Sequence, residues 1–271
     1  KETVQVSVVI HTYNHEAFIA RAIEGALIQK TDFRFELIVH DDASTDSTPL
    51  IISRYVSRYP DIIQFIAQTE NQMSQGRRPP CTTFPGSSGA FIAICEGDDF
   101  WIDPLKLQKQ YEAMAKYPQS NLCVHGAYIT KGERPEKVHW DFGPKEKVID
   151  VSEVFRKRNQ FAPTASYFIR KSGLGILPRW FYDDPDLPYG DFLIEAALGL
   201  SGIVALPEAM SVYRRGTIGS HTESTRVLKD GLFINRTSRM IKFIDKLADE
   251  LGIEESLVVC KKDLIALDCC L

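Results

Sequence analysis

Two acidic pairs lie shortly after apolar runs in the first hundred residues of this chain. Asp41-Asp42 comes just after the run 35–39, and Asp98-Asp99 comes just after the run 90–95. Mg²⁺ and Mn²⁺ favour a few carboxylate oxygens together with phosphate oxygens of a substrate. Two acidic strand ends can bind a phosphate-containing nucleotide if one pair contacts the base or ribose and the other binds a divalent cation. Helix-capping or solvated turns are the structural alternatives for the two pairs.

The apolar patterning predicts the elements that position these pairs. Four runs predict buried strands, at residues 6–10, 35–39, 62–67 and 90–95. Three stretches with helical spacing or helix-start residues lie between or after them, at 16–29, from Pro49 onward and at 103–117. This alternation is typical of a parallel sheet covered by helices. Ligands of such sheets collect at the carboxyl ends of the strands, where both acidic pairs fall.

The remainder of the chain is less regular. Residues 68–89 are rich in Gln, Gly, Pro and Ser and are interpreted as a long loop. Strands are expected near 122–125, 166–169, 203–206 and 211–213, and helices near 151–158, 191–200, 226–250 and 254–267. No linker separates independent domains, so we expect one α/β domain over residues 1–271.

Composition excludes several classes of protein. The chain has 32 Lys and Arg against 36 Asp and Glu, a net charge of −4, which disfavours a broad nucleic-acid surface. No apolar run reaches the roughly 18–20 residues of a membrane-spanning helix, and no signal peptide is visible. The six cysteines form no C-x-x-C pair, so we do not expect a zinc site. We expect a reducing, cytoplasmic location. The basic helix expected over 226–247 either packs on the domain or makes a peripheral contact with the inner face of the membrane.

Three segments resemble the family 2 glycosyltransferases, which have the GT-A fold. They are VSVVIHTYNHEAFIARAIEGALIQ, FELIVHDDASTDST and AFIAICEGDDFWIDPLKLQKQ, in that order along the chain. The resemblance implies a mostly parallel central sheet flanked by helices, with an acceptor-side region and terminal helices beyond it. It also implies inverting transfer of a sugar from a nucleotide donor, most commonly UDP-linked, to a glycan or lipid-linked acceptor, with Mn²⁺ or Mg²⁺.

The resemblance also implies roles for individual residues near the strand ends. Asp42 would read the base, Asp98 would contact the ribose or diphosphate, and Asp99 would ligate the metal. The residues near the nucleoside would be Thr12, Tyr13 and Asn14. His221 lies in a Gly-rich segment and would close over the diphosphate or complete the metal shell, unless it is an ordinary surface histidine.

The resemblance further implies a catalytic Asp about 90 residues after the acidic pair, at the start of a helix. Asp191 lies 92 residues after Asp99 and opens the helix expected at 191–200, so it is the candidate general base. The family often has Glu before this Asp, whereas this chain has Gly190. A capping role is the structural alternative, and three nearby acids are rival bases: Asp183, Asp184 and Asp186.

The segment before the fourth strand also departs from the family pattern. Many relatives have A-R-N-x-G there, whereas this chain has Arg77 and Arg78 in a Pro-rich stretch that either approaches the diphosphate or is solvated. We expect a nucleotide-sugar-binding half at 1–117, an acceptor half at 118–225 and C-terminal helices at 226–271. A sugar-nucleotide pyrophosphorylase and a non-catalytic nucleotide- or sugar-binding protein are the alternative functions.

Overall fold

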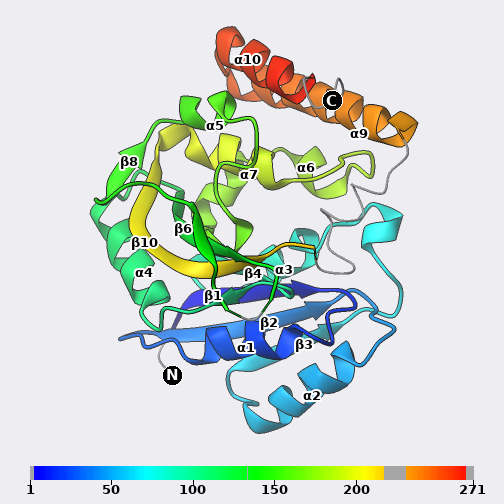
Figure 1. Cartoon of the computed structure of the whole chain (residues 1–271), viewed down its shortest axis with the longest axis vertical. Coiled ribbons are helices and arrows are strands. Elements are labelled where there is room, and N and C mark those ends of the chain that lie inside the picture. The colour runs from blue at the N-terminus through cyan, green and yellow to red at the C-terminus, as the bar shows by residue number, and fades with distance from the viewer. Residues whose placement is uncertain (1–2, 133, 217–229, 267–271) are drawn as a thin grey trace.

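The computed structural model describes residues 3–132, 134–216 and 230–266 (Figure 1). Within them, ten strands form one sheet, with the main order β3-β2-β1-β4-β9-β6-β10-β5 and with β7 and β8 paired to β6 and β10. The strands are β1 (Val4–Thr12), β2 (Arg34–Asp41), β3 (Ile63–Ala67), β4 (Phe91–Glu96), β5 (Phe100–Trp101), β6 (Leu122–Thr130), β7 (Lys137–Trp140), β8 (Lys147–Ile149), β9 (Phe168–Arg170) and β10 (Ile203–Arg214).

The first four predicted strands pair in parallel, as the alternation indicated. β1 lies between β2 and β4, and β2 pairs with β3, all in parallel. Beyond β4 the sheet becomes mixed, because β9 pairs antiparallel with both β4 and β6. β6 and β10 are parallel again. The carboxyl ends of β1, β2 and β4 therefore meet at one edge, where the acidic pairs lie.

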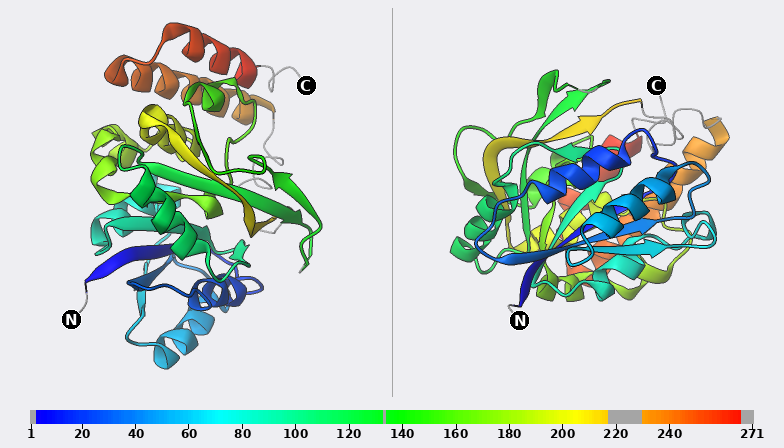
Figure 2. Two further views of the ribbon diagram at one scale, coloured as in Figure 1. Left: turned by 90° about the vertical axis from the view of Figure 1, so that its left-hand side faces the viewer. Right: turned by 90° about the horizontal axis from the view of Figure 1, so that it is seen from below.

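Helices cover both faces of the sheet (Figure 2). They are α1 (Ile19–Leu27), α2 (Thr48–Arg58), α3 (Pro80–Gly86), α4 (Lys106–Lys116), α5 (Ser152–Arg156), α6 (Arg179–Asp183), α7 (Asp191–Leu198), α9 (Asp230–Leu251) and α10 (Glu255–Ala266). One apolar core joins the sheet to α1, α2 and α4, and the other joins it to α5, α6, α7, α9 and α10. Neighbouring residues of β1 alternate between them, since Val8 and Ile10 belong to the first core and Val9 to the second. Burial on both faces explains why this strand is apolar throughout.

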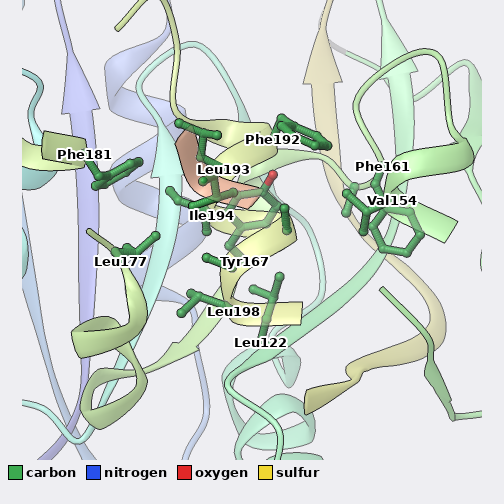
Figure 3. Packing of buried hydrophobic residues seen from close by; sticks show 14 of the residues in the cluster. Leu122, Val154, Phe161, Tyr167, Leu177, Phe181, Phe192, Leu193, Ile194 and Leu198 are labelled. Carbon is green, nitrogen blue, oxygen red and sulfur yellow. The ribbon is translucent and has the colours of Figure 1, made fainter. Parts of the chain in front are cut away.

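Figure 3 shows the second core, in which Tyr167 lies among α7 side chains such as Leu193 and Ile194. This packing fixes α7 against the sheet.

Several parts of the fold differ from the sequence prediction. Strands β5, β7 and β8 and helix α6 were not predicted. The segment expected as a loop contains a 3-10 turn at Met73–Gln75 and helix α3, which starts at Pro80 and holds Pro85 within it. The two strands expected at 203–206 and 211–213 are one strand, β10, whose register shifts between Leu206 and Ser211. A shift of this kind accommodates Pro207, which has no N–H for the ladder.

The basic C-terminal helix packs on the domain. Among the described side chains of α9, five apolar residues are buried in the second core: Met240, Phe243, Ile244, Leu247 and Ala248. Among the described residues no helix is long and apolar enough to cross a bilayer. The apolar side of this helix therefore faces protein, which is the packing alternative named above.

Lys106, the first residue of α4, is fully buried beneath the strand that follows the second acidic pair. Its Nζ lies 3.7 Å from the centroid of the Trp101 ring and has no hydrogen-bond partner among the described residues. The Trp101 Nε1 donates to the Ala165 carbonyl at 2.8 Å. Burial lowers the pKa of Lys106 to about 7. The nearby thiols of Cys95 and Cys123 have the opposite, smaller effect on this pKa.

We expect Lys106→Met to stabilise the protein most at or below pH 7. Lys106 has a pKa of 10.5 in the unfolded chain and about 7 in the folded chain. Below pH 7 the folded protein must bury a charged ammonium group, which lowers its stability. Between pH 7 and 10.5 only the unfolded chain binds the proton, so the free energy of unfolding rises with pH. Denaturant unfolding should show a gain of roughly 2–4 kcal/mol at pH 6 that shrinks by pH 9. Lys109→Met, on the same helix but paired with Asp103 at 2.7 Å, is the control without such a gain. An equal gain at both pH values would contradict the account.

Candidate active site

The acidic turn after β4 is held by the end of β10. The backbone N–H of Arg214 donates to Asp99 Oδ1 at 2.9 Å, and its guanidinium donates to the Asp98 carbonyl at 2.6 Å. The guanidinium carbon also lies 4.9 and 4.6 Å from the ring centroids of Phe18 and Phe100. Burial and the neighbouring Asp98 carboxylate raise the pKa of Asp99 well above its usual range. Arg214 thus fixes a turn that concentrates negative charge.

Asp42 is buried at the end of β2 and orients the 3-10 turn that follows β3. Its Oδ1 accepts from Gln72 N at 2.7 Å, and its Oδ2 accepts from Met73 N at 3.0 Å. The next residue, Ala43, has a φ of 62°, a left-handed conformation that is uncommon for residues with a Cβ. Asp41 instead accepts from the Ser44 N–H at 3.1 Å. The chain therefore turns sharply here, with the Asp42 carboxylate held against the 70–76 loop.

The residues expected near the nucleoside lie beside this turn. Thr12 is buried, with its Oγ1 3.2 Å from His15 Nδ1. Asn14 has a φ of 53°, and its Oδ1 accepts from Thr45 N at 2.8 Å, so it ties the end of β1 to the loop after β2. Tyr13, at 37% exposure, is the one of these three side chains that is open to solvent. Thr12 and Asn14 therefore have structural bonds in addition to any role in binding.

Asp191 is the first residue of α7 and lies near the acidic turn, although the two are far apart in the sequence. Burial and the negative charges of Asp191 and Asp98 raise the pKa of Glu96 to about 8. Burial also raises the pKa of Asp191 to about 6, against the opposing effect of Arg236. Asp191 makes no side-chain capping bond, and the cap position is Gly190. The capping alternative is thus wrong, and α7 brings a carboxyl with a raised pKa to the β4 end.

Gly190 replaces the Glu that the family often has, and its surroundings explain the departure. A Cβ at this position would lie 2.9 Å from Cε2 of the Phe181 ring. A larger side chain would therefore displace this buried ring.

A buried hydrogen-bond network holds α7 in place one turn after Asp191. Glu195 is fully buried and accepts from Tyr167 Oη at 2.7 Å and from Ala162 N at 2.9 Å. Burial raises the pKa of Glu195 to about 7 despite these bonds, which lower it. The Gln160 side-chain amide donates in turn to Tyr167 Oη at 3.3 Å.

The rival acids upstream of Asp191 are engaged elsewhere. Asp183 pairs with Arg179 at 3.1 Å on the exposed surface. Asp184 and Asp186 pair with basic residues of α9, at 3.8 Å to Lys246 and 3.4 Å to Arg239. These ion pairs join the loop before α7 to α9.

The two arginines of the 68–89 segment differ in their surroundings. Arg78 is buried, and its guanidinium donates to the Phe181 carbonyl and, at 3.0 Å, to the Asp184 carbonyl. Arg77 is exposed, 3.4 Å from Gln72 Oε1. Arg78 is therefore neither solvated nor directed at a diphosphate in this structure. It joins the segment before α3 to α6 and to the residue that follows α6.

The acidic turn fits a divalent cation that is shared with a substrate. Among the described residues, no group of three or more His, Cys, Asp or Glu side chains could form a complete metal site. A Mg²⁺ or Mn²⁺ ion bound with substrate phosphates needs only one or two protein carboxylates. Asp99, desolvated beside Asp98 and with one oxygen engaged by Arg214, would gain a counter-charge from such an ion. His221 lies outside the described residues.

Sequence reasoning gave Arg214 and Arg236 no definite role and did not mark Glu96 or Glu195 as site residues. Arg214 is 3% exposed, although a basic pair at a strand end is typical of a solvated turn. A basic residue at a strand end signals neither its bond to Asp98, 116 residues away, nor its aromatic partners. The acidic trio beginning at Glu96 was the only available signal for that residue.

The structure thus places acidic strand ends on a parallel half-sheet, with a separate carboxyl nearby at the start of a helix. The family model described as glycosyl transferase family 2 matches residues 7–175. The chain belongs to this family.

Two curated relatives illustrate the range of the family. An uncharacterized protein of Mycobacterium tuberculosis is 33% identical over 219 residues, which cover 79% of this chain and 60% of that protein. The Escherichia coli UDP-Glc:alpha-D-GlcNAc-diphosphoundecaprenol beta-1,3-glucosyltransferase WfgD is 27% identical over 172 residues, 61% of this chain and 65% of that protein. The chain thus spans less than two thirds of the length of both relatives.

Solved structures share the fold. Staphylococcus aureus TarS 1–349 in complex with UDP-GlcNAc has a TM-score of 0.66 at 18% identity, over 97% of this chain and 71% of that one. The Pyrobaculum calidifontis mannosyltransferase PcManGT, in complex with GDP-Man and Mn²⁺, has a TM-score of 0.59 at 17% identity, over 96% and 69%. The GT-A fold expected from the sequence is confirmed.

We expect Arg214→Met to lower the free energy of unfolding by about 1.5–3 kcal/mol, because a buried, charge-assisted hydrogen bond is lost. Arg215→Met is the matched control: its side chain is exposed, so the change should stay within about 0.5 kcal/mol. Urea unfolding of both variants measures the difference. Equal losses would show that the contacts of Arg214 contribute nothing specific.

Proposed function

We propose that this glycosyltransferase moves a sugar from a UDP-linked donor to a hydroxyl of a glycan or lipid-linked acceptor, by a single displacement with inversion. One observation supports the proposal above all. Asp191 lies beside the acidic turn of β4, so a candidate base and a candidate cation site face one region. No observation specifically favours a pyrophosphorylase or a non-catalytic binding protein.

The donor side is assigned to the strand ends. Asp42 would accept a hydrogen bond from the base, with Thr12, Tyr13 and Asn14 near the nucleoside. Asp98 would contact the ribose or diphosphate, and Asp99 would hold Mn²⁺ or Mg²⁺, with His221 as a further ligand or diphosphate contact. The cation, when bound, would neutralise charge that develops on the leaving diphosphate.

Asp191 is assigned as the general base. With a pKa of about 6 it is mostly ionised at neutral pH, yet basic enough to accept a proton from a hydroxyl. As the acceptor oxygen bonds to the anomeric carbon, its proton passes to Asp191 and the nucleoside diphosphate leaves from the opposite face. No second carboxylate is needed as a nucleophile. The Glu195 network holds α7, and hence this carboxyl, in position.

The same assignment divides the chain. Residues 1–117 would bind the nucleotide sugar and residues 118–225 would form the acceptor half, of which 217–225 lie outside the described residues. In the C-terminal part, 226–271, the described helices are α9 and α10. Two similar proteins support the proposal of a UDP-linked donor. WfgD is named as using UDP-Glc, and the TarS structure contains UDP-GlcNAc. WfgD, which acts on a diphosphoundecaprenol-linked acceptor, also supports a lipid-linked acceptor and work at the inner face of the membrane.

We expect Asp191→Asn to abolish transfer while nucleotide binding is retained, because the amide cannot accept the proton. In the unaltered enzyme kcat/KM should fall below about pH 6 as Asp191 becomes protonated. A pH profile of transfer and a UDP titration of the variant measure both effects. Asp186→Asn, in an exposed ion pair with Arg239, is the control and should keep its activity. Full transfer by Asp191→Asn would remove it from the mechanism.

We expect UDP to raise the melting temperature only when Mn²⁺ or Mg²⁺ is present. At a concentration 100 times its Kd, a ligand stabilises the native state by about 2.7 kcal/mol. A thermal-shift screen of nucleoside diphosphates with and without Mn²⁺ measures the effect. Asp99→Asn should remove the metal-dependent part, and Asp103→Asn, four residues further along, should leave it intact. A shift that is independent of the metal in the unaltered chain would contradict the assignment of Asp99.

A further inference from the structure

The turn that Asp42 holds lies directly against the segment that leads to α7. The Asp42 carboxylate accepts hydrogen bonds from the backbone N–H groups of Gln72 and Met73. At the end of this turn Gly76 has a φ of 78°, and a Cβ on it would lie 2.7 Å from Pro185 Cα. Glycine is the residue that adopts this conformation readily and leaves room for so close an approach. The nucleotide side of the site and the segment 181–187 therefore touch here.

Arg78, two residues after this glycine, makes the polar part of the same junction. Its guanidinium donates to three backbone carbonyls of the segment 181–187, those of Phe181, Asp184 (at 3.0 Å) and Leu187 (at 3.5 Å). The side chain is 6% exposed, so these bonds are shielded from water. A guanidinium carries its N–H donors in one rigid plane, and its bonds are charge-assisted. One buried side chain thus fixes the segment at three points.

The segment 181–187 leads to the start of α7 and packs against it. The Phe181 ring lies so close to Gly190 that a Cβ there would be 2.9 Å from Cε2 of the ring. Phe181 and Leu187 are buried in the second core together with Phe192 of α7. A displacement of this segment would therefore be passed on to Asp191, which follows Gly190 in the chain.

The attachments of this segment to α9 are weaker. Asp184 lies 3.8 Å from Lys246, and Asp186 lies 3.4 Å from Arg239, in largely exposed ion pairs. Exposed ion pairs contribute little because water screens both charges, whereas buried charge-assisted hydrogen bonds contribute more. The bonds of Arg78 are thus the firmer constraint, and they connect the segment to the nucleotide side of the site.

The two ends of this junction are the residues that the proposed reaction must hold in register. The nucleotide, bound at Asp42, determines where the anomeric carbon lies, and Asp191 must reach the hydroxyl that attacks this carbon. A misplacement of about 1 Å can lower the rate of such a step about 100-fold. The link between the two parts of the chain is therefore a candidate determinant of the rate.

We propose that Arg78 is a positioning residue for the transfer reaction, which holds the start of α7 against the nucleotide-binding turn and so places Asp191 relative to the bound donor. The inference rests on the proposed function and assigns it a further residue. It also predicts a kinetic signature. A residue that contacts the donor changes KM, whereas a residue that only places the general base changes kcat.

Hydrolysis of UDP-glucose and UDP-GlcNAc by the full chain with Mn²⁺ tests the proposal, because water takes the place of the acceptor hydroxyl. We expect Arg78→Met to lower kcat about 10–100-fold, with KM and the Kd of UDP changed less than about threefold. Arg78→Lys keeps a charged donor and should lose less. If Arg78→Met does not fold, Arg78→Lys alone should still lower kcat at an unchanged KM.

Lys171→Met is the matched control. Lys171 donates to the carbonyl of Ser87, just after α3, so this variant loses a similar bond outside the junction and should keep its kcat. The melting temperature of each variant is measured first, and all assays are run well below it.

Two results would overturn the proposal. The first is a rise in KM or in the Kd of UDP that accounts for the whole loss, which would make Arg78 a donor contact. The second is a kcat that stays unchanged in Arg78→Met or falls equally in Lys171→Met, which would leave Arg78 a role in stability alone. An unaltered chain that hydrolyses neither UDP-sugar would instead contradict the proposed function, on which this proposal rests.

Discussion

The repulsion among carboxyl groups at one end of the sheet is the constraint on which the rest of the site depends. Acids from β4 and from the start of α7 share a partly buried region, where the pKa of Glu96 rises to about 8 and that of Asp191 to about 6. Charges gathered in this way need cations nearby or the fold loses stability. Arg214 and Arg236 supply positive charge from β10 and α9, and the proposed divalent ion would add to it.

The parts of this arrangement that are local in sequence could be predicted from it. Apolar runs that end in Asp41-Asp42 and Asp98-Asp99 define strands and acidic turns within a few residues. Their placement at one edge follows because parallel strands have their carboxyl ends together. Asp191 was predicted from the spacing that the family resemblance implies and from the helix it opens, and Gly190 beside it follows from the nearness of Phe181.

The parts that were missed depend on contacts between distant residues or on locally ambiguous composition. Arg78 bonds to carbonyls more than 100 residues away, and no pattern near it reports that. Helix α3 begins at Pro80, where proline is well tolerated, but its Gly and Pro content is typical of a loop. Strand β10 continues past Pro207 because its register shifts there, a detail that pairing with β6 decides. Side-chain networks and irregular strands can therefore be recognised only once the fold is known.

The central claim is that the acidic strand ends and Asp191 form one transfer site. A crystal structure with UDP and Mn²⁺, in which the metal is located by its anomalous scattering, tests it most directly. The account predicts one metal peak coordinated by the Asp99 carboxylate and the diphosphate, with the base of UDP at Asp42 and the terminal phosphate directed toward Asp191. Nucleotide bound away from Asp42, or a metal without Asp99 as a ligand, would contradict it.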